Sequence, residues 1–180
     1  MSVLFSAIEV SRQVFHRTTL TFAIVNLKPI VPGHVLVCPT RPAPRLKDLN
    51  VDELSELMIS VNRVGSVLER AYAADGLTVA CQDGKAAGQS VPHVHFHILP
   101  RKLSGDRFSG ARNDDIYPAL EVHEGELGAV AKNAKADQMS GEANVVHEPL
   151  KMDADAERKP RSMEEMEREA TWLRGFFEGP

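Results

Sequence analysis

The sequence predicts an α+β fold in which an antiparallel sheet has a long helix packed on one face and a second helix at the C-terminus. Two observations indicate this class: β-branched and aromatic runs occur in two pairs, and one long stretch with helical spacing separates the pairs. This order favours an antiparallel sheet over a doubly wound parallel one, in which strands and helices alternate. The 180 residues are about the length of one domain. We therefore expect a single core.

The first pair of strands is predicted at residues 20–27, LTFAIVNL, and at residues 34–39, HVLVCP. The short segment between them contains two prolines and Gly33, residue types that are typical of a tight turn. These features predict a hairpin. An extra strand or helix between residues 3 and 15 is compatible with the pattern.

A long helix is predicted from residue 51 to about residue 74. Asn50 is a good N-cap, and Glu53 stands where a capping box has its acid. Gly76 is expected to end the helix. One face of this helix is expected to pack on the sheet, because its apolar residues recur at steps of three and four: Leu54, Leu57, Met58, Val61, Val64 and Leu68.

The second pair of strands is predicted at LTVACQDG, which starts at Leu77, and at VPHVHFHILP, residues 91–100. The loop GKAAGQS connects them. Beyond Arg101 the composition changes, and residues 121–161 contain few large apolar residues and no sustained period. This segment is expected to be a disordered insert between a catalytic domain, residues 1–120, and a C-terminal helix, residues 162–180.

The C-terminal helix is predicted from its cap and its apolar face. Ser162 is followed three residues later by Glu165, which forms the capping-box pattern. The helix is expected to pack on the domain through Met166, Ala170, Leu173, Phe176 and Phe177.

Bulk properties exclude several classes of function. A formal net charge of −4 and an isoelectric point near 6.0 provide no basic surface for general nucleic-acid binding. No window approaches the roughly 20 apolar residues of a membrane span. Cys38 and Cys81 show no disulfide or metal spacing. We expect a soluble protein of the cytoplasm, small enough to enter the nucleus as well.

Three of the seven histidines stand at alternate positions in HVHFHILPR: His93, His95 and His97. In a strand they share one face, roughly 7 Å apart, while the apolar residues between them face the core. A solvated polar face is one interpretation of this pattern. A second is a zinc site, in which three imidazoles leave one position open and His34 supplies a fourth ligand. A third is a catalytic device.

The loop before the histidines favours phosphate over zinc. It contains two glycines that allow close backbone approach, and Gln82, Gln89 and Ser90 supply neutral donors and acceptors. A neutral imidazole is a good nucleophile towards phosphorus. The middle histidine, His95, is the natural nucleophile because a histidine lies on each side to orient it and to stabilise charge.

These residues resemble the histidine triad (HIT) superfamily, whose pattern alternates histidine with apolar residues. The segments FAIVNLKPIVPGHVLVCPTRP, QDGKAAGQSVPHVHFHILPRK and RNDDIYPAL resemble its fragile histidine triad (Fhit) branch. The resemblance implies a HIT-like fold, a homodimer, and hydrolysis of diadenosine triphosphate to AMP and ADP. His95 would attack the α-phosphorus and form a nucleotidyl-histidine, which water then resolves.

The resemblance also implies roles for other residues. His97 would contact the phosphate and the bridging oxygen, His93 would orient the nucleophile, and His34 would support the triad. Tyr117 falls at a position where the family is phosphorylated. A divalent cation, Mg or Mn, would accompany the polyphosphate instead of sitting in a protein cage. Asn26 would contact the ribose. The full set of implied substrate-binding residues is Asn26, Gln82, Gly88, Gln89, Ser90, Val91 and His97.

Two departures from the family leave alternatives open. Ala7 and Ile8 stand where relatives can have a nucleotide-contacting histidine, and the segment after residue 120 is longer than in compact members. The preference for triphosphate or tetraphosphate therefore stays open. The rival functions are a Hint-type nucleoside phosphoramidase and a dinucleotide-binding signalling protein with slow turnover.

Overall fold

The computed structural model describes residues 2–140 and 160–177, and it has the predicted α+β class. Five strands form one antiparallel sheet in the order β3-β4-β5-β7-β6. Their bounds are β3 Val14–Arg17, β4 Thr21–Val25, β5 Val35–Pro39, β6 Gly76–Ala80 and β7 Phe96–Arg101. A separate small hairpin, β1 Leu4–Phe5 and β2 Ile8–Glu9, precedes the sheet.

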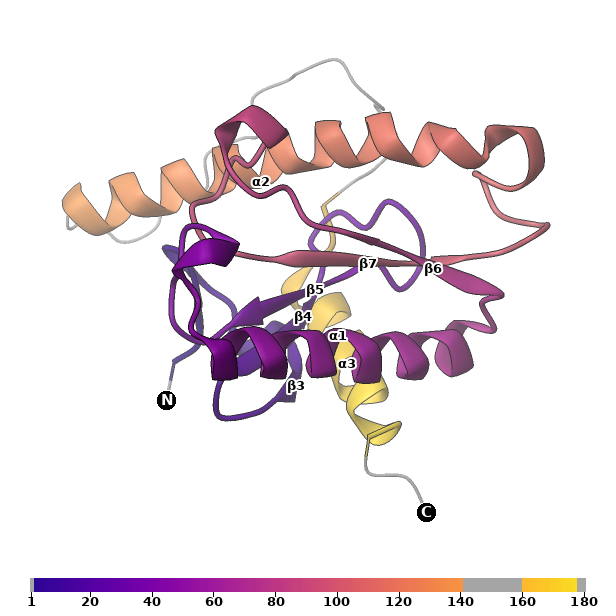
Figure 1. Cartoon of the computed structure of the whole chain (residues 1–180), viewed down its shortest axis with the longest axis horizontal. Helices are drawn as coiled ribbons and strands as arrows, with labels where there is room; N and C mark the ends of the chain where they lie inside the picture. Colours follow the sequence, from indigo (N-terminus) through magenta and orange to yellow (C-terminus); the bar gives the residue numbers. More distant parts are fainter. Residues whose placement is uncertain (1, 141–159, 178–180) are drawn as a thin grey trace.

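Helices cover both faces of the sheet. The helices α1, Val51–Tyr72, and α3, Met163–Gly175, lie on one side, and α2, Ile116–Ser140, lies on the other (Figure 1). The sequence led us to expect helices on only one face of the sheet. The helix on the second face explains why every residue of β4 and β5 is buried, because strands buried on both faces need no alternation of polar and apolar residues.

The helix α1 begins as predicted. Glu53 N–H donates to Asn50 Oδ1 over 2.9 Å, and Asn50 N–H donates to Glu53 Oε2 over 3.0 Å, which completes the capping box. The helix ends at Tyr72, where Ala73 adopts the left-handed conformation with φ 48°. The prediction that Gly76 ends the helix was wrong, because Ala73 performs that turn and Gly76 already begins β6.

The predicted apolar stripe of α1 is confirmed in part. Leu57, Val61, Val64 and Leu68 are buried in the main core cluster. The outer members of the stripe, Leu54 and Met58, are exposed.

The prediction of a disordered insert was wrong for residues 121–140, which continue α2. The rest of that insert, residues 141–159, lies outside the described residues. The buried positions of α2 do follow steps of three and four: Ile116, Leu120, His123, Glu124, Gly128 and Ala131. Two of these are polar and one is a glycine, so hydrophobic periodicity alone did not reveal the helix.

The predicted C-terminal helix is present as α3, but it ends at Gly175, before Phe176 and Phe177, and residues 178–180 lie outside the described residues. Ser162 and Glu165 form a capping box, and Met166, Ala170 and Leu173 are buried in the same core as α1. Just before the helix, Arg161 N–H donates to the carbonyl of Leu27 over 3.0 Å. This bond ties the start of α3 to the end of β4.

Two further expectations concern composition. Among the described residues, no helix is long and apolar enough to cross a membrane. Cys38 and Cys81 are free thiols, the first buried and the second partly buried.

Candidate active site

The three histidines lie at the entrance to β7. Only His97 belongs to the strand, which begins at Phe96 and not at residue 91 as the alternation predicted. All three rings are at most 1% exposed, so the interpretation as a solvated polar face is wrong. The helix α2 covers one face of the sheet (Figure 1), and its Glu124 contacts His95 and His97.

His93 is held by two main-chain groups. Ser6 N–H donates to its Nδ1 over 3.0 Å, so the ring proton is on Nε2, which donates to the carbonyl of Pro39 over 2.8 Å. Burial lowers the pKa of His93 to about 4, against the opposing effect of the Pro39 hydrogen bond. His93 is therefore a neutral, fixed ring at neutral pH.

The N-terminal hairpin supports this arrangement. Ser6 lies in its turn with φ 54°, a left-handed conformation that directs the N–H at His93. The ring of Phe5 packs against His93 and His95, with centroids 5.4 Å and 5.2 Å away. A segment with a weak sequence signal thus buttresses two of the three histidines.

His95 has a defined orientation. Its Nδ1 lies 2.7 Å from the carbonyl of His93, which can only accept, so Nδ1 carries a proton. Nε2 is consequently the only nitrogen that can act as a nucleophile. That nitrogen lies 2.9 Å from Oε2 of Glu124 in α2.

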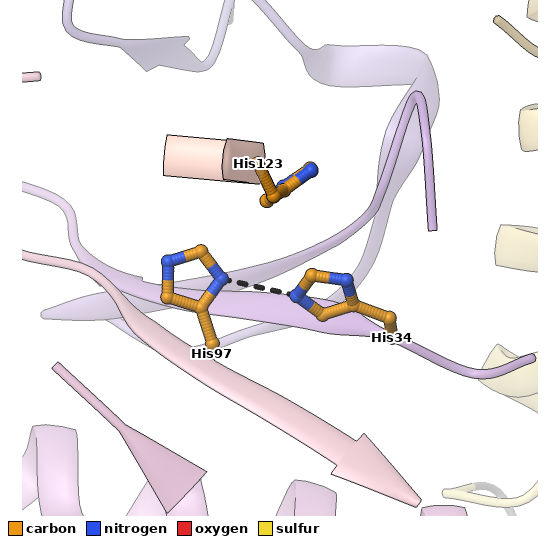
Figure 2. A group of neighbouring side chains, drawn as sticks. All are labelled: His34, His97 and His123. Carbon is orange, nitrogen blue, oxygen red and sulfur yellow. Dashed lines mark hydrogen bonds between the residues drawn. The ribbon is translucent and has the colours of Figure 1, made fainter. Parts of the chain in front are cut away.

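His34 and His97 form a relay with a consistent set of protons. Ile30 N–H donates to His34 Nδ1 over 3.2 Å, and His34 Nε2 then donates to His97 Nδ1 over 3.0 Å (Figure 2). His97 Nε2 points to Glu124 Oε2, 3.3 Å away. Burial lowers the pKa of His97, and the bond to Glu124 opposes that shift. The relay therefore presents an N–H of His97 to the site.

Asn26 lies at the end of β4 and is 2% exposed. Its Oδ1 accepts from Lys28 N–H over 3.2 Å, so its Nδ2 is the donor to His123 Nε2, 2.9 Å away. Arg161 Nε donates to the Asn26 carbonyl over 3.0 Å. Arg161, just before α3, and His123 of α2 therefore both contact the predicted ribose-binding residue.

The glycine loop is built around Gln89. Its Oε1 accepts from Gly84 N–H and its Nε2 donates to the carbonyl of Pro44, each over 2.8 Å. The amide that was expected to contact phosphate holds the loop itself in this structure. Gly88 has φ +87°, a conformation that favours glycine.

Three other predicted positions have different surroundings. Val91 is fully buried in the core cluster next to β1 and β2. The Oε1 of Gln82 is buried without a hydrogen-bond partner in the described part of the chain. Tyr117 is 57% exposed in the first turn of α2.

Sequence reasoning missed two side chains of α2 in the site: His123, which contacts Asn26, and Glu124. The Oε1 of Glu124 accepts from Ser90 N–H and from Ser90 Oγ, each over 2.9 Å, while Oε2 faces His95 and His97. Burial alone would raise the pKa of Glu124, but the hydrogen bonds from His95, His97 and Ser90 hold it well below its usual range. The carboxylate is ionised. Its only sequence signal is its place four residues after Leu120, on the buried face of α2.

Within the described part of the chain, two groups of three side chains have ligand atoms within 4.8 Å of one another: His34, His97 and His123, and His95, His97 and Glu124. His93 belongs to neither, because both its nitrogens bind main chain. The predicted alternative of a zinc site built on all three triad histidines is therefore wrong. In the first group, a cation would have to replace the proton between His34 and His97 (Figure 2).

Comparison with known proteins places this site in a family. Residues 7–103 match the HIT domain family. The chain is 47% identical over 173 residues to the fission yeast bis(5'-nucleosyl)-tetraphosphatase (asymmetrical), covering 96% of this chain and 93% of that protein. It is 45% identical to the bifunctional bis(5'-adenosyl)-triphosphatase/adenylylsulfatase FHIT of Arabidopsis thaliana, with coverage of 93% and 79%. The Dictyostelium discoideum bis(5'-adenosyl)-triphosphatase is 43% identical, with coverage of 92% and 86%.

Solved structures agree with this placement. The NitFhit protein of Caenorhabditis elegans superposes with a TM-score of 0.64 at 31% identity, over 97% of this chain and 30% of that longer protein. The Plasmodium falciparum diadenosine triphosphate hydrolase has the same fold, with a TM-score of 0.66 at 24% identity over 98% of this chain and 84% of that one. The chain therefore belongs to the HIT domain family, in its fragile histidine triad branch.

Proposed function

We propose that this protein is a dinucleoside polyphosphate hydrolase that cleaves diadenosine triphosphate to AMP and ADP. The observation that carries the proposal is the orientation of His95. Because its Nδ1 proton is bound to the His93 carbonyl, its Nε2 is the nitrogen left to attack phosphorus. The names of the Arabidopsis and Dictyostelium relatives, both bis(5'-adenosyl)-triphosphatases, support the same activity.

The reaction proceeds in two displacements. The Nε2 lone pair of His95 attacks the α-phosphorus, the P–N bond forms, and the bond to the bridging oxygen breaks so that ADP leaves. Water then attacks the same phosphorus, the P–N bond breaks, and AMP leaves with the water oxygen. The electron pair of the P–N bond returns to Nε2, and the proton lost by water goes to solvent.

The neighbouring histidines divide the remaining tasks. His97 presents its Nε2–H to the bridging oxygen and stabilises the charge that develops as ADP leaves. His34 keeps His97 in that tautomer. His93 fixes the position of His95 through its own carbonyl.

The substrate includes a divalent cation, Mg or Mn, on its polyphosphate, which neutralises charge without a dedicated protein cage. Asn26 binds the ribose, and Gln82, Gly88, Gln89, Ser90, Val91 and His97 surround the phosphates. Phosphorylation is proposed for Tyr117, whose side chain is 57% exposed. We also propose that the protein is cytoplasmic and that it forms a homodimer. Sedimentation velocity of the purified chain tests the homodimer.

The test of the function uses diadenosine triphosphate and tetraphosphate in ¹⁸O-labelled water. We expect hydrolysis of the triphosphate with label in AMP and none in ADP, because water attacks only the α-phosphorus bound to His95. Label in ADP would contradict the mechanism. The name of the fission yeast relative, a tetraphosphatase, makes the second substrate the necessary comparison. A much faster release of AMP from adenosine phosphoramidate would indicate the Hint-type activity instead.

The matched variants are His95→Asn and His16→Asn. His95→Asn should abolish hydrolysis and leave the dinucleotide bound, because only the nucleophile is lost. His16 is also a buried histidine, but it lies on β3 and stacks on Phe177, so His16→Asn should keep the wild-type rate. Normal turnover by His95→Asn would refute the covalent route.

A further inference from the structure

Two consecutive residues of α2 occupy the positions that the proposed function gives to the nucleotide. Glu124 binds His95, His97 and Ser90, where the phosphate is expected. His123 accepts the Nδ2–H of Asn26, where the ribose is expected. Both side chains are only 1% exposed.

The contacts of Glu124 match those that a phosphate would make. An ionised carboxylate and a phosphate both present anionic oxygens that only accept hydrogen bonds. Glu124 Oε2 lies 2.9 Å from His95 Nε2 and 3.3 Å from His97 Nε2. Its other oxygen takes the N–H and the hydroxyl of Ser90. Glu124 therefore uses the donors that His95, His97 and Ser90 would offer to a phosphate.

This arrangement is incompatible with attack by His95. Its Nδ1–H is bound to the His93 carbonyl, and the carboxylate of Glu124 can only accept. The proton in the contact with Glu124 therefore lies on Nε2 of His95. A nitrogen that carries this proton has no lone pair for the phosphorus.

The helix is shaped to approach the site closely. A Cβ added at Gly128 would lie 2.5 Å from the Cβ of Ser90, so this approach requires glycine. On the solvent side of the same helix, a Cβ at Gly125 would meet nothing within 4 Å. Lys28 Nζ and Glu126 Oε1, 3.2 Å apart, add a contact between α2 and the segment after β4.

We propose that Glu124 is a built-in occupant of the phosphate position, which the nucleotide displaces together with α2 before His95 can react. This inference rests on the proposed function, because it requires that a nucleotide binds at the triad. Glu124 is then a positioning residue. It supplies a hydrogen-bond partner to His95 and His97 while no nucleotide is bound, and it lowers the affinity for substrate because the substrate must displace it.

The effect on affinity follows from the population of the open state. If only a fraction of molecules has α2 displaced, the apparent Kd is the intrinsic Kd divided by that fraction. An open population of about 10% or less corresponds to an apparent affinity about tenfold or more below the intrinsic one. Removing the Glu124 carboxylate should therefore raise the apparent affinity for the nucleotide by the same factor.

The first experiment measures AMP binding by calorimetry and hydrolysis of diadenosine triphosphate in Glu124→Ala. We expect the Kd for AMP and the KM to fall by about tenfold, with kcat at or above the wild-type value. Glu121→Ala is the control, because Glu121 is an exposed carboxylate on the same helix. A lower kcat with an unchanged Kd would overturn the proposal and identify Glu124 as a reacting group.

The second experiment separates displacement of the helix from simple removal of a negative charge. Gly128→Leu keeps Glu124 but clashes with Ser90, whereas Gly125→Leu adds the same side chain where there is space. We expect Gly128→Leu alone to bind AMP more tightly than wild type. Equal affinity of the two leucine variants would show that α2 does not have to move.

Hydrogen exchange supplies an independent readout. Saturating AMP should speed amide exchange in residues 120–131 of wild type, because the nucleotide displaces the helix. Slower exchange there would mean that α2 closes over the nucleotide, which overturns the proposal. Hydrolysis with unchanged AMP affinity in Glu124→Ala and Gly128→Leu overturns this inference alone. Absence of both AMP binding and hydrolysis in every protein overturns the proposed function and this inference together.

Discussion

His34 and His97 share a hydrogen bond of 3.0 Å that fixes which nitrogen of His97 faces the site. The direction of this bond is set from the main chain, because the N–H of Ile30 occupies Nδ1 of His34. His97 must then accept at Nδ1 and carry its proton on Nε2. A buried main-chain group thereby determines the hydrogen-bonding character of a ring that faces the substrate.

Replacement of His34 tests this relay. His34→Ala should lower kcat by about tenfold, less than the roughly 10²- to 10⁴-fold contribution of a general acid, because His97 itself remains. His34→Gln should recover much of the rate, since its amide N–H can donate to His97 Nδ1. Steady-state kinetics on diadenosine triphosphate measure both values. Equal rates for the alanine and glutamine variants would contradict the relay.

The free energy of unfolding should depend on pH through His93. Its folded pKa of about 4 lies below the unfolded value of 6.5, so the unfolded chain binds the proton more readily. The stability from the neutral ring is complete above pH 6.5 and is lost as the pH falls towards 4. We expect a loss of about 2 kcal/mol between pH 7 and pH 5.

Urea denaturation of wild type and His93→Gln at both pH values measures this contribution. Glutamine offers an acceptor for Ser6 and a donor for Pro39 without titrating, so its stability should depend less on pH. His16 and His97, whose pKa values are also lowered by burial, contribute equally to both proteins and cancel in the comparison. Parallel pH profiles for the two proteins would show that His93 is not the titrating group.

Gly33 should tolerate no side chain. It has φ +79°, and a Cβ there would lie 2.6 Å from the ring of Tyr72 and 2.9 Å from Pro100. Gly33→Ala should therefore cost about 2 kcal/mol or more, from backbone strain together with the clash. Gly76→Ala is the matched control, since a Cβ at that position meets nothing within 4 Å. Chemical denaturation should show little change for the control, and similar losses for both variants would contradict the argument.

The capping box of α3 should contribute measurable stability. Ser162→Ala removes the acceptor of the Glu165 N–H and should lower the free energy of unfolding by about 1 kcal/mol. Ser55→Ala is the control, because the Ser55 hydroxyl bonds only to the Val51 carbonyl within α1. Its effect should stay within about 0.5 kcal/mol. Thermal unfolding measures the stability of both variants. Equal, small losses for the two would show that Ser162 is an ordinary surface serine and not a stabilising cap.

Local signals accounted for much of the fold. The capping boxes at Asn50 and Ser162 and the turn at Gly33 depend on residues a few positions apart, and all three are present. The same kind of signal was insufficient for α2. Its buried face contains His123 and Glu124, and a period defined by apolar residues does not count them.

In the candidate site, too, local sequence signals identified some features and left others to the tertiary structure. The alternation of His93, His95 and His97 was enough to identify the chemical groups and the central nucleophile. It was not enough to assign partners, since Gln89 bonds within its own loop and His93 bonds to the N-terminal hairpin. Such partners depend on how distant segments pack.

The sequence by itself determined the two central strand pairs, the helices α1 and α3 with their caps, and the set of histidines, because each depends on the chemistry of near neighbours. Only the tertiary structure decided that Glu124 meets His95, 29 residues away in the chain. That contact depends on the docking of α2 across the sheet, where the fit of Gly128 against Ser90 and the burial of Ile116 and Leu120 act together. The physical reason is that docking depends on shape and buried contacts summed over a whole face, which no local pattern specifies.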